Sequence, residues 1–472
     1  MSASAPTPAQ NCADPLADIT IAKVLGDWEA LPATATLAQT LVVHAKQWER
    51  IAEVNKILGA WDSNAGLSAW VNAHEGSGSP VIAPLVDYVK AARALPAWAD
   101  PARTARAETL FMAYGALSCT LLFCSSLPEC YVIPDLADVL HVAGQLEQHT
   151  EYRIRMTAAM IFPVMMKGGM STPAGGGVAQ VLKVRLIHAT IRNLILRGSP
   201  EQALADPVPV PPLPGLRGTP RMHHAMFAHG WDTATDGLPC NQEELAYTLL
   251  TFGYVFLRSL RIQGLGLSSA DEEDFLHAWN VVGHVLGIQD ALMAHTMDQA
   301  QALFDSLQTR GRRDVRADDP RPALGQALMQ TMAGVIPFRL LKPFPVLMTR
   351  YLCGAQTARD LGLTGGAAWL SKALFALFAL FMGFTRLIDT LARLVWPEFS
   401  ISRLITRVLG YHFMTRLLMD QTRPLQLPNQ LLNRIDAAME SWSDDPKAPA
   451  WMNRFEDRLT TRGSWTSPGL RR

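Results

Sequence analysis

One histidine, His188, combines a residue type and a spacing that suit cofactor chemistry. On a helix, residues three, four and seven positions apart share a face. His188 then lies beside the apolar Val184 and Ile191 and beside the guanidinium groups of Arg185 and Arg192. Imidazole ligates iron, apolar neighbours line a macrocycle and arginine pairs with propionates, so the pattern suits a haem. Taken alone, a histidine on a half-apolar helix is more often a structural residue.

A second segment with chemical potential lies about thirty residues before His188. Arg153 and Thr157 are four residues apart and share a helix face, with Met156 beside them. Because a buried unpaired charge is costly, Arg153 needs a partner. A haem propionate, a bound oxygen species or Glu147 can supply one, and an ordinary salt bridge is the alternative.

Composition excludes several classes of function. The chain of 472 residues is 49% hydrophobic and 18% charged, with Lys plus Arg equal to Asp plus Glu at 42 each. A net charge of zero argues against nucleic acid as a partner. The six cysteines form no CxxC pair and fit a reducing compartment. The first thirty residues contain no secretory signal pattern, so we expect a cytoplasmic protein, with membrane association as a further option.

The periodicity of apolar residues is helical almost throughout, which predicts an all-α fold with one large helical domain. Residues 1–20 are small, polar and contain proline, and predict a flexible arm. We expect residues 21–310 to form the main helical domain and residues 311–472 a helical C-terminal extension.

Two stretches are nearly free of charge. Thr109 to Pro128 is long enough for a transmembrane span, but its polar residues and final proline favour a buried central helix. The second is a hydrophobic helix expected at about residues 367–396, with a phenylalanine at every third position from Phe375 to Phe384. Its uncharged core of thirteen residues spans about 20 Å, short of a bilayer core of about 30 Å. A peripheral membrane anchor and a buried helix both remain open.

Two helix starts follow from local chemistry. Asn241 and Ser269 each precede a glutamate by three residues, a spacing typical of N-caps. The second helix carries an apolar stripe that predicts core packing, formed by Phe275, Trp279, Val282 and Leu286.

Several segments, taken in order, resemble one known family. They are Gly144-Gln145-Leu146 with Arg153 and Thr157, the stretch from Arg185 to Arg192, Pro239 to Leu245, Trp279 to Ile288, and Arg423-Pro424-Leu425 to Leu427-Pro428. Their order and spacing resemble the rubber oxygenase and MpaB-like oxygenase family, well over residues 100–300 and loosely elsewhere.

This resemblance implies an all-helical domain around a buried, non-covalent haem b. His188 matches the proximal iron ligand, with Arg185 and Arg192 flanking the cofactor, whereas Arg153 and Thr157 match distal-side positions. Latex-clearing members carry a lysine beside that threonine, and this chain has Met156. The resemblance therefore implies either an open distal site or methionine ligation. Rubber-degrading members are also typically secreted, so a different, intracellular substrate is expected here.

The expected function is that of a haem b oxygenase that uses O2 to cleave double bonds in a hydrophobic small molecule or polymer, isoprenoid or lipid-like. One alternative is a haem-binding sensor or electron-transfer protein with Met156 as the sixth ligand. Another is a cofactor-free, membrane-peripheral helical protein in which His188 is structural. The sequence leaves the oligomeric state open.

Overall fold

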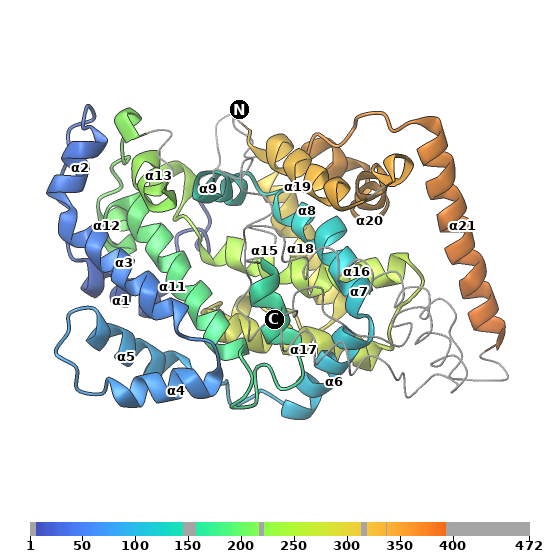
Figure 1. The fold of residues 1–472 in the computed structure, drawn as a ribbon, viewed down its shortest axis with the longest axis horizontal. Helices are drawn as coiled ribbons and strands as arrows, with labels where there is room; N and C mark the ends of the chain where they lie inside the picture. The colour runs from blue at the N-terminus through green and yellow to red at the C-terminus, as the bar shows by residue number, and fades with distance from the viewer. Residues whose placement is uncertain (1–5, 145–156, 217–220, 313–318, 337, 393–472) are drawn as a thin grey trace, which may run out of the picture.

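The computed structural model describes residues 6–144, 157–216, 221–312, 319–336 and 338–392. Within these residues the regular elements are helices, and the one β-type pairing is an isolated bridge between Val210 and Trp231. The all-α prediction is confirmed. Figure 1 shows the helices packed around a central group made of α11, α15 and α17, with α21 along one edge.

The N-terminal half, up to residue 236, contributes a series of α-helices in addition to the helical residues 157–165. They are α1 (Pro15–Leu25), α2 (Leu37–Val43), α3 (Ala45–Gly59), α4 (Asn64–Ala73), α5 (Ile82–Ala92), α6 (Pro101–Ala113), α7 (Gly115–Leu121), α8 (Leu127–Cys130), α9 (Pro134–Gly144), α11 (Gly177–Leu196), α12 (Pro200–Ala205), α13 (Met222–His229) and α14 (Thr233–Asp236).

The C-terminal half continues with further α-helices. They are α15 (Gln242–Phe252), α16 (Tyr254–Ile262), α17 (Ser269–Leu286), α18 (Met297–Gly311), α19 (Arg321–Val335), α20 (Phe344–Asp360) and α21 (Trp369–Ala392).

The prediction of a flexible arm over residues 1–20 is wrong for the part that the structure describes. Helix α1 begins at Pro15, and the Asp14 side chain caps it by accepting a hydrogen bond from the Ala17 backbone N–H at 3.4 Å. One face of α1 packs on α11 and α5. Asp14 and Asp18 look solvent-seeking in the sequence, but both are buried. They are buried because they pair with arginines of α11.

The uncharged stretch from Thr109 to Pro128 is helical and largely buried, but it is not one helix. It passes from α6 through α7 and the π-helical turn η1 (Leu122–Ser126) into α8. Inside η1 the Ser125 hydroxyl donates to the Leu121 carbonyl at 2.7 Å, which satisfies a polar group in the core. Among the described residues, no helix combines the length and hydropathy needed to cross a bilayer.

Local cap signals place the two helices that face α11. Asn241 caps α15 as expected, by accepting from the Glu244 backbone N–H at 3.0 Å. The cap of α17 is Ser268 rather than Ser269, and it accepts from the Asp271 N–H at 3.2 Å. The one-residue shift leaves the register of the apolar stripe on α17 unchanged. Helix α17 packs on both α11 and α15, and the three helices supply three walls of the site.

Candidate functional site

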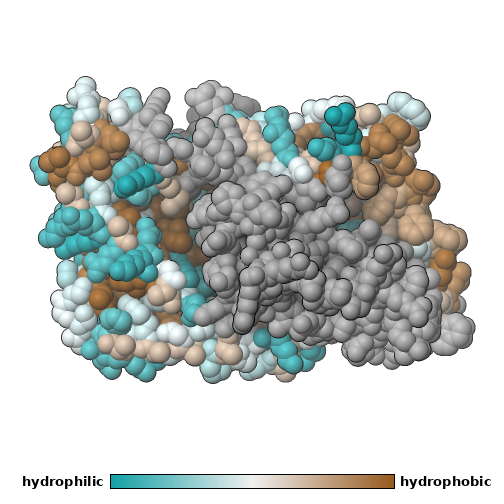
Figure 2. Space-filling view, viewed as in Figure 1, coloured by the Kyte–Doolittle hydropathy of each residue, from teal (hydrophilic) through white to brown (hydrophobic). Residues whose placement is uncertain are grey.

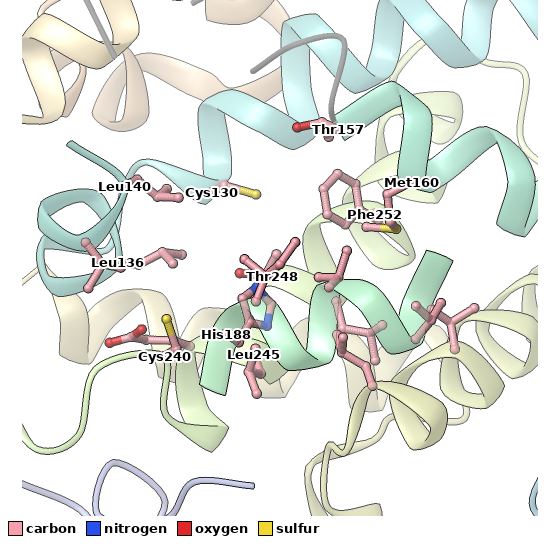
Figure 3. A pocket seen from close by; sticks show the side chains of 18 of the residues that line it. Cys130, Leu136, Leu140, Thr157, Met160, His188, Cys240, Leu245, Thr248 and Phe252 are labelled. Atoms are coloured by element: carbon pink, nitrogen blue, oxygen red, sulfur yellow. The ribbon is translucent and has the colours of Figure 1, made fainter. Parts of the chain in front are cut away.

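A cavity of about 320 Å³ lies between α9, α11, α15 and α17 (Figure 3). Its lining is overwhelmingly apolar. The lining residues are Leu127, Cys130, Leu136, Val139, Leu140, Thr157, Met160, Val181, Val184, Ile187, His188, Ile191, Cys240, Glu244, Leu245, Thr248, Leu249, Phe252, Trp279, Val282 and Leu286.

His188 reaches this cavity because of its position on α11. Residues 181, 184, 187, 188 and 191 repeat every three or four positions and all line the cavity. The Nδ1 atom of His188 is buried and has no hydrogen-bond partner among the described residues. Burial, assisted by the charge of Arg192, lowers the pKa of His188 to about 4. The imidazole is therefore neutral near pH 7, which is the form that ligates a metal.

Arg185 is held by Asp14 in a two-pronged ion pair. Its Nε donates to Asp14 Oδ2 at 2.5 Å and its Nη2 to Asp14 Oδ1 at 2.7 Å, while Nη1 donates to the Val285 carbonyl at 3.0 Å. Gly287, which ends α17 with a φ of +89°, lies against the pair, and a Cβ there would come within 2.7 Å of Asp14 Oδ2. The start of α1, the middle of α11 and the end of α17 thus meet at the ion pair of Asp14 and Arg185.

Arg192, which lies about two helical turns after Arg185 on α11, is enclosed in a similar way. Its Nε donates to Asp18 Oδ1 at 2.9 Å and its Nη1 to the Cys240 carbonyl at 2.5 Å. Its Nη2 is buried and has no hydrogen-bond partner among the described residues. Burial raises the pKa of Asp18 although Arg192 opposes the shift. Neither Arg185 nor Arg192 lines the cavity. Both have carboxylate partners within the protein, and a role toward haem propionates stays a prediction.

Thr157 lies across the cavity from His188 (Figure 3). It opens the helical residues 157–165, on which Met160 also faces the cavity. The structure therefore brings together two residues that the sequence analysis assigned to opposite sides of a cofactor. Arg153, Met156 and Glu147 lie outside the described residues. Their predicted distal-side roles, including methionine ligation, stay predictions.

Glu244 is a cavity residue that sequence reasoning did not single out. Its Oε1 accepts from Asn241 Nδ2 at 3.1 Å, whereas its Oε2 is buried without a hydrogen-bond partner among the described residues. Burial, followed by the nearby charge of Asp135, raises the pKa of Glu244 well above its usual value. Burial at the cavity wall therefore favours the protonated form of this carboxyl group. Its place one helical turn before Thr248 was a usable signal, because both face the same side of α15.

The stripe on α17 serves two purposes rather than one. Phe275 is core, as expected, and stacks on Phe256 with ring centroids 4.8 Å apart. Trp279 and Val282 are buried in the same core, and together with the partly buried Leu286 they also line the cavity. The prediction of core packing is confirmed, but the cavity contact of three of the four residues could not be predicted, because an apolar stripe looks the same in the sequence whether it meets a neighbouring helix or a cavity.

The donor set suits a porphyrin-bound metal better than a protein-chelated ion. A metal held by side chains alone needs three or four ligands, and the described residues contain no group of three or more His, Cys, Asp or Glu that could hold one. A b-type haem needs one axial side chain and apolar walls. The cavity offers a neutral imidazole in an apolar lining, so the residues present fit that group.

The comparisons with known proteins agree with the class that this fold and cavity define, an all-α protein with an apolar cofactor-sized site. The family model described as ER-bound oxygenase mpaB/B'/Rubber oxygenase, catalytic domain, matches residues 132–387. The match spans more than half of the 472-residue chain. The chain belongs to this family.

The chain is also similar to one relative and to one solved structure. The rubber oxygenase of Streptomyces sp. (strain K30) is 23% identical over 309 residues, which cover 64% of this chain and 65% of that protein. The aligned part is thus just under two thirds of the relative's length. The solved structure of the latex clearing protein LCP in the closed state matches with a TM-score of 0.56 and 17% identity, over 93% of this chain and 91% of that chain. The structural likeness shows a shared fold.

Proposed function

We propose that this protein is a haem b-dependent oxygenase that uses O2 to cleave a carbon–carbon double bond in a hydrophobic, isoprenoid or lipid-like substrate. The observation that carries the proposal is the neutral imidazole of His188 in an apolar cavity. It is supported by membership of a family described by its oxygenase activity.

His188 would hold the iron. An imidazole whose Nδ1 lacks a partner is costly in an apolar cavity unless a bound group uses the ring. The haem, when bound, supplies the dioxygen chemistry, and the protein supplies binding, orientation and the exclusion of water. The paired Arg185 and Arg192 fix the turns of α11 on either side of His188.

The cavity lining argues for an apolar substrate. A polar substrate would lose its hydration without gaining hydrogen bonds from walls of Leu, Ile, Val, Phe and Trp. Few side chains in the lining carry polar groups, and these include Thr157, Thr248 and Glu244. Thr157 would orient the reacting part of the substrate through its hydroxyl. The protonated Oε2 of Glu244 is able to donate a hydrogen bond or a proton within the cavity.

Oxygen uptake by the haem-loaded protein tests this proposal. We would compare a short cis-polyisoprene oligomer and an unsaturated fatty acid with their saturated analogues, and detect carbonyl products by mass spectrometry after reaction under ¹⁸O2. Cleavage of one double bond by one O2 gives two carbonyl groups, each with one labelled oxygen. We expect uptake only with the unsaturated compounds. Stable haem binding without uptake on either class would contradict oxygenase activity.

A further inference from the structure

One face of α21 exposes a continuous apolar stripe. It is formed by side chains spaced three or four residues apart and is called here the outer face of α21: Leu377, Leu380, Phe381, Phe384, Leu387 and Leu391. Leu380 is 71% exposed and Phe384 59%. Figure 2 shows hydrophobic residues gathered along the edge of the molecule where α21 runs in Figure 1. Contiguous exposed apolar surface of this kind marks an interaction site.

The opposite side of α21 packs on α20, and the outer face therefore points away from the protein. Phe344 of α20 packs on Phe375 and Phe378, with ring centroids 5.4 and 6.1 Å apart. Met382 and Thr385, further along the same side, are buried. Of the four evenly spaced phenylalanines, the first two face inward and the last two outward. Helix α21 is therefore buried along one side and exposed along the other.

A cluster of aromatic and basic side chains adjoins the N-terminal half of α21. Trp369, the first residue of α21, is 78% exposed. Phe338, which directly precedes Arg339, is 67% exposed. The short helix η4 (Arg339–Leu341) contacts α21. The exposed cations here are Arg339, Lys342 and Lys372. None of the three forms an ion pair with another described residue. Exposed aromatics beside unpaired cations are typical of a membrane–water interface.

The charge balance of the region indicates an anionic surface as the partner. Between residue 338 and the end of α21 at residue 392 the sequence has six Lys and Arg residues and two acidic residues, Asp360 and Asp389. Asp360 is already paired with Arg312 at 2.7 Å. A second copy of this region would bring the same excess of cations. Residues 393–472 also carry more Lys and Arg than Asp and Glu, twelve against eight, so they do not supply the missing negative charge.

We propose that the outer face of α21 docks on an anionic phospholipid bilayer, with the helix lying in the plane of the interface. No helix among the described residues is suited to cross a bilayer, and a stripe along one side of a helix fits surface binding instead. Leucine and phenylalanine side chains of the stripe enter the acyl boundary, and Arg339, Lys342 and Lys372 face the phosphate headgroups. This docking is independent of the function proposed for the cavity.

Co-sedimentation of the full chain with vesicles tests the proposal. We expect binding to vesicles with 30% phosphatidylglycerol and much weaker binding to pure phosphatidylcholine. Leu380→Gln with Phe384→Gln should lower the partition coefficient by more than about tenfold. Lys342→Gln and Lys372→Gln should each lower it by about fivefold. Val42→Gln is the matched control, because Val42 is 77% exposed but lies on α2, and it should bind as the unchanged protein does.

A reporter at the stripe separates the bilayer from other occupants. We would label Leu380→Cys with a polarity-sensitive fluorophore and add anionic vesicles. A blue shift on addition supports the proposal. An emission that is already blue-shifted without vesicles, and does not change with them, shows that the chain itself or a second copy covers the face. That result would overturn the proposal, as would sedimentation that Leu380→Gln with Phe384→Gln leaves unchanged.

Discussion

Asp14 and Arg185 form a buried, two-pronged ion pair between the start of α1 and the helix that carries His188. Arg185 lies three residues before His188, on an adjacent part of the same helix surface. The pair therefore ties the N-terminal segment, which lies outside the matched family region at residues 132–387, to the side chain most central to the proposed chemistry.

Removing Asp14 should be strongly destabilising. Asp14→Ala leaves the Arg185 guanidinium buried without its carboxylate, and breaking a buried pair in this way costs about 3–5 kcal/mol. Chemical denaturation measures the loss in the free energy of unfolding. The control is Glu75→Ala, which breaks the exposed pair between Lys90 and Glu75 and should leave stability unchanged. Equal effects of the two substitutions would show that the Asp14 pair is not held in a buried environment.

Glu244→Gln should change how stability depends on pH. The folded-state pKa of Glu244 is raised above its unfolded value near 4.5, so the folded state favours the protonated form. This contribution to stability is fully present below about pH 4.5 and is lost as the pH rises through the folded pKa. Glutamine keeps a neutral side chain at every pH. As the pH rises from 5 to 9, the melting temperature of the variant should therefore increase relative to that of the unchanged protein. A difference between the two melting temperatures that stays constant over this range would contradict a raised pKa of Glu244.

A larger side chain at Val282 should fill the cavity without harming the fold. Val282 faces the cavity, whereas Val285 on the same helix is buried in the core and does not line it. We expect Val282→Phe to change the free energy of unfolding by less than about 1 kcal/mol and to reduce haem uptake. Val285→Phe should cost about 1–3 kcal/mol through overpacking. If both variants unfold alike, the cavity is not open space in solution.

Thr157→Val tests the hydroxyl that faces His188 across the cavity. The two side chains have similar shapes, so haem binding should persist, whereas turnover of an unsaturated substrate should fall roughly 3- to 10-fold with the loss of one hydrogen bond. Thr190→Val is the control, because the Thr190 hydroxyl donates to the Leu186 carbonyl within α11. Equal turnover of the Thr157 variant and the unchanged protein would remove Thr157 from the proposed site.

The sequence could predict those features that depend on residues close to one another along the chain. The N-cap at Asn241 and the cavity-facing side of α11 follow from residues three or four apart, and both could be read directly. The arm expected over residues 1–20 could not be corrected from sequence, because Asp14 and Asp18 are explained by partners 171 and 174 residues away.

Similar reasoning explains two features that the sequence left open. Glu244 looks like an ordinary first-turn acid of a capped helix, and only its burial among distant helices raises its pKa. The phenylalanines from Phe375 to Phe384 are spaced by three, so each one rotates further around a helix of 3.6 residues per turn. Which of them turn inward is decided by Phe344 on another helix.

The absorption spectrum of His188→Ala, reconstituted with haem beside the unchanged protein, tests the central assignment most directly. We expect a Soret band with stoichiometric haem in the unchanged protein, greatly reduced occupancy in the variant, and recovery when free imidazole is added. His284→Ala, which alters a half-exposed histidine on α17, should bind haem normally. An identical Soret band and occupancy in His188→Ala would contradict the role of His188 as the iron ligand.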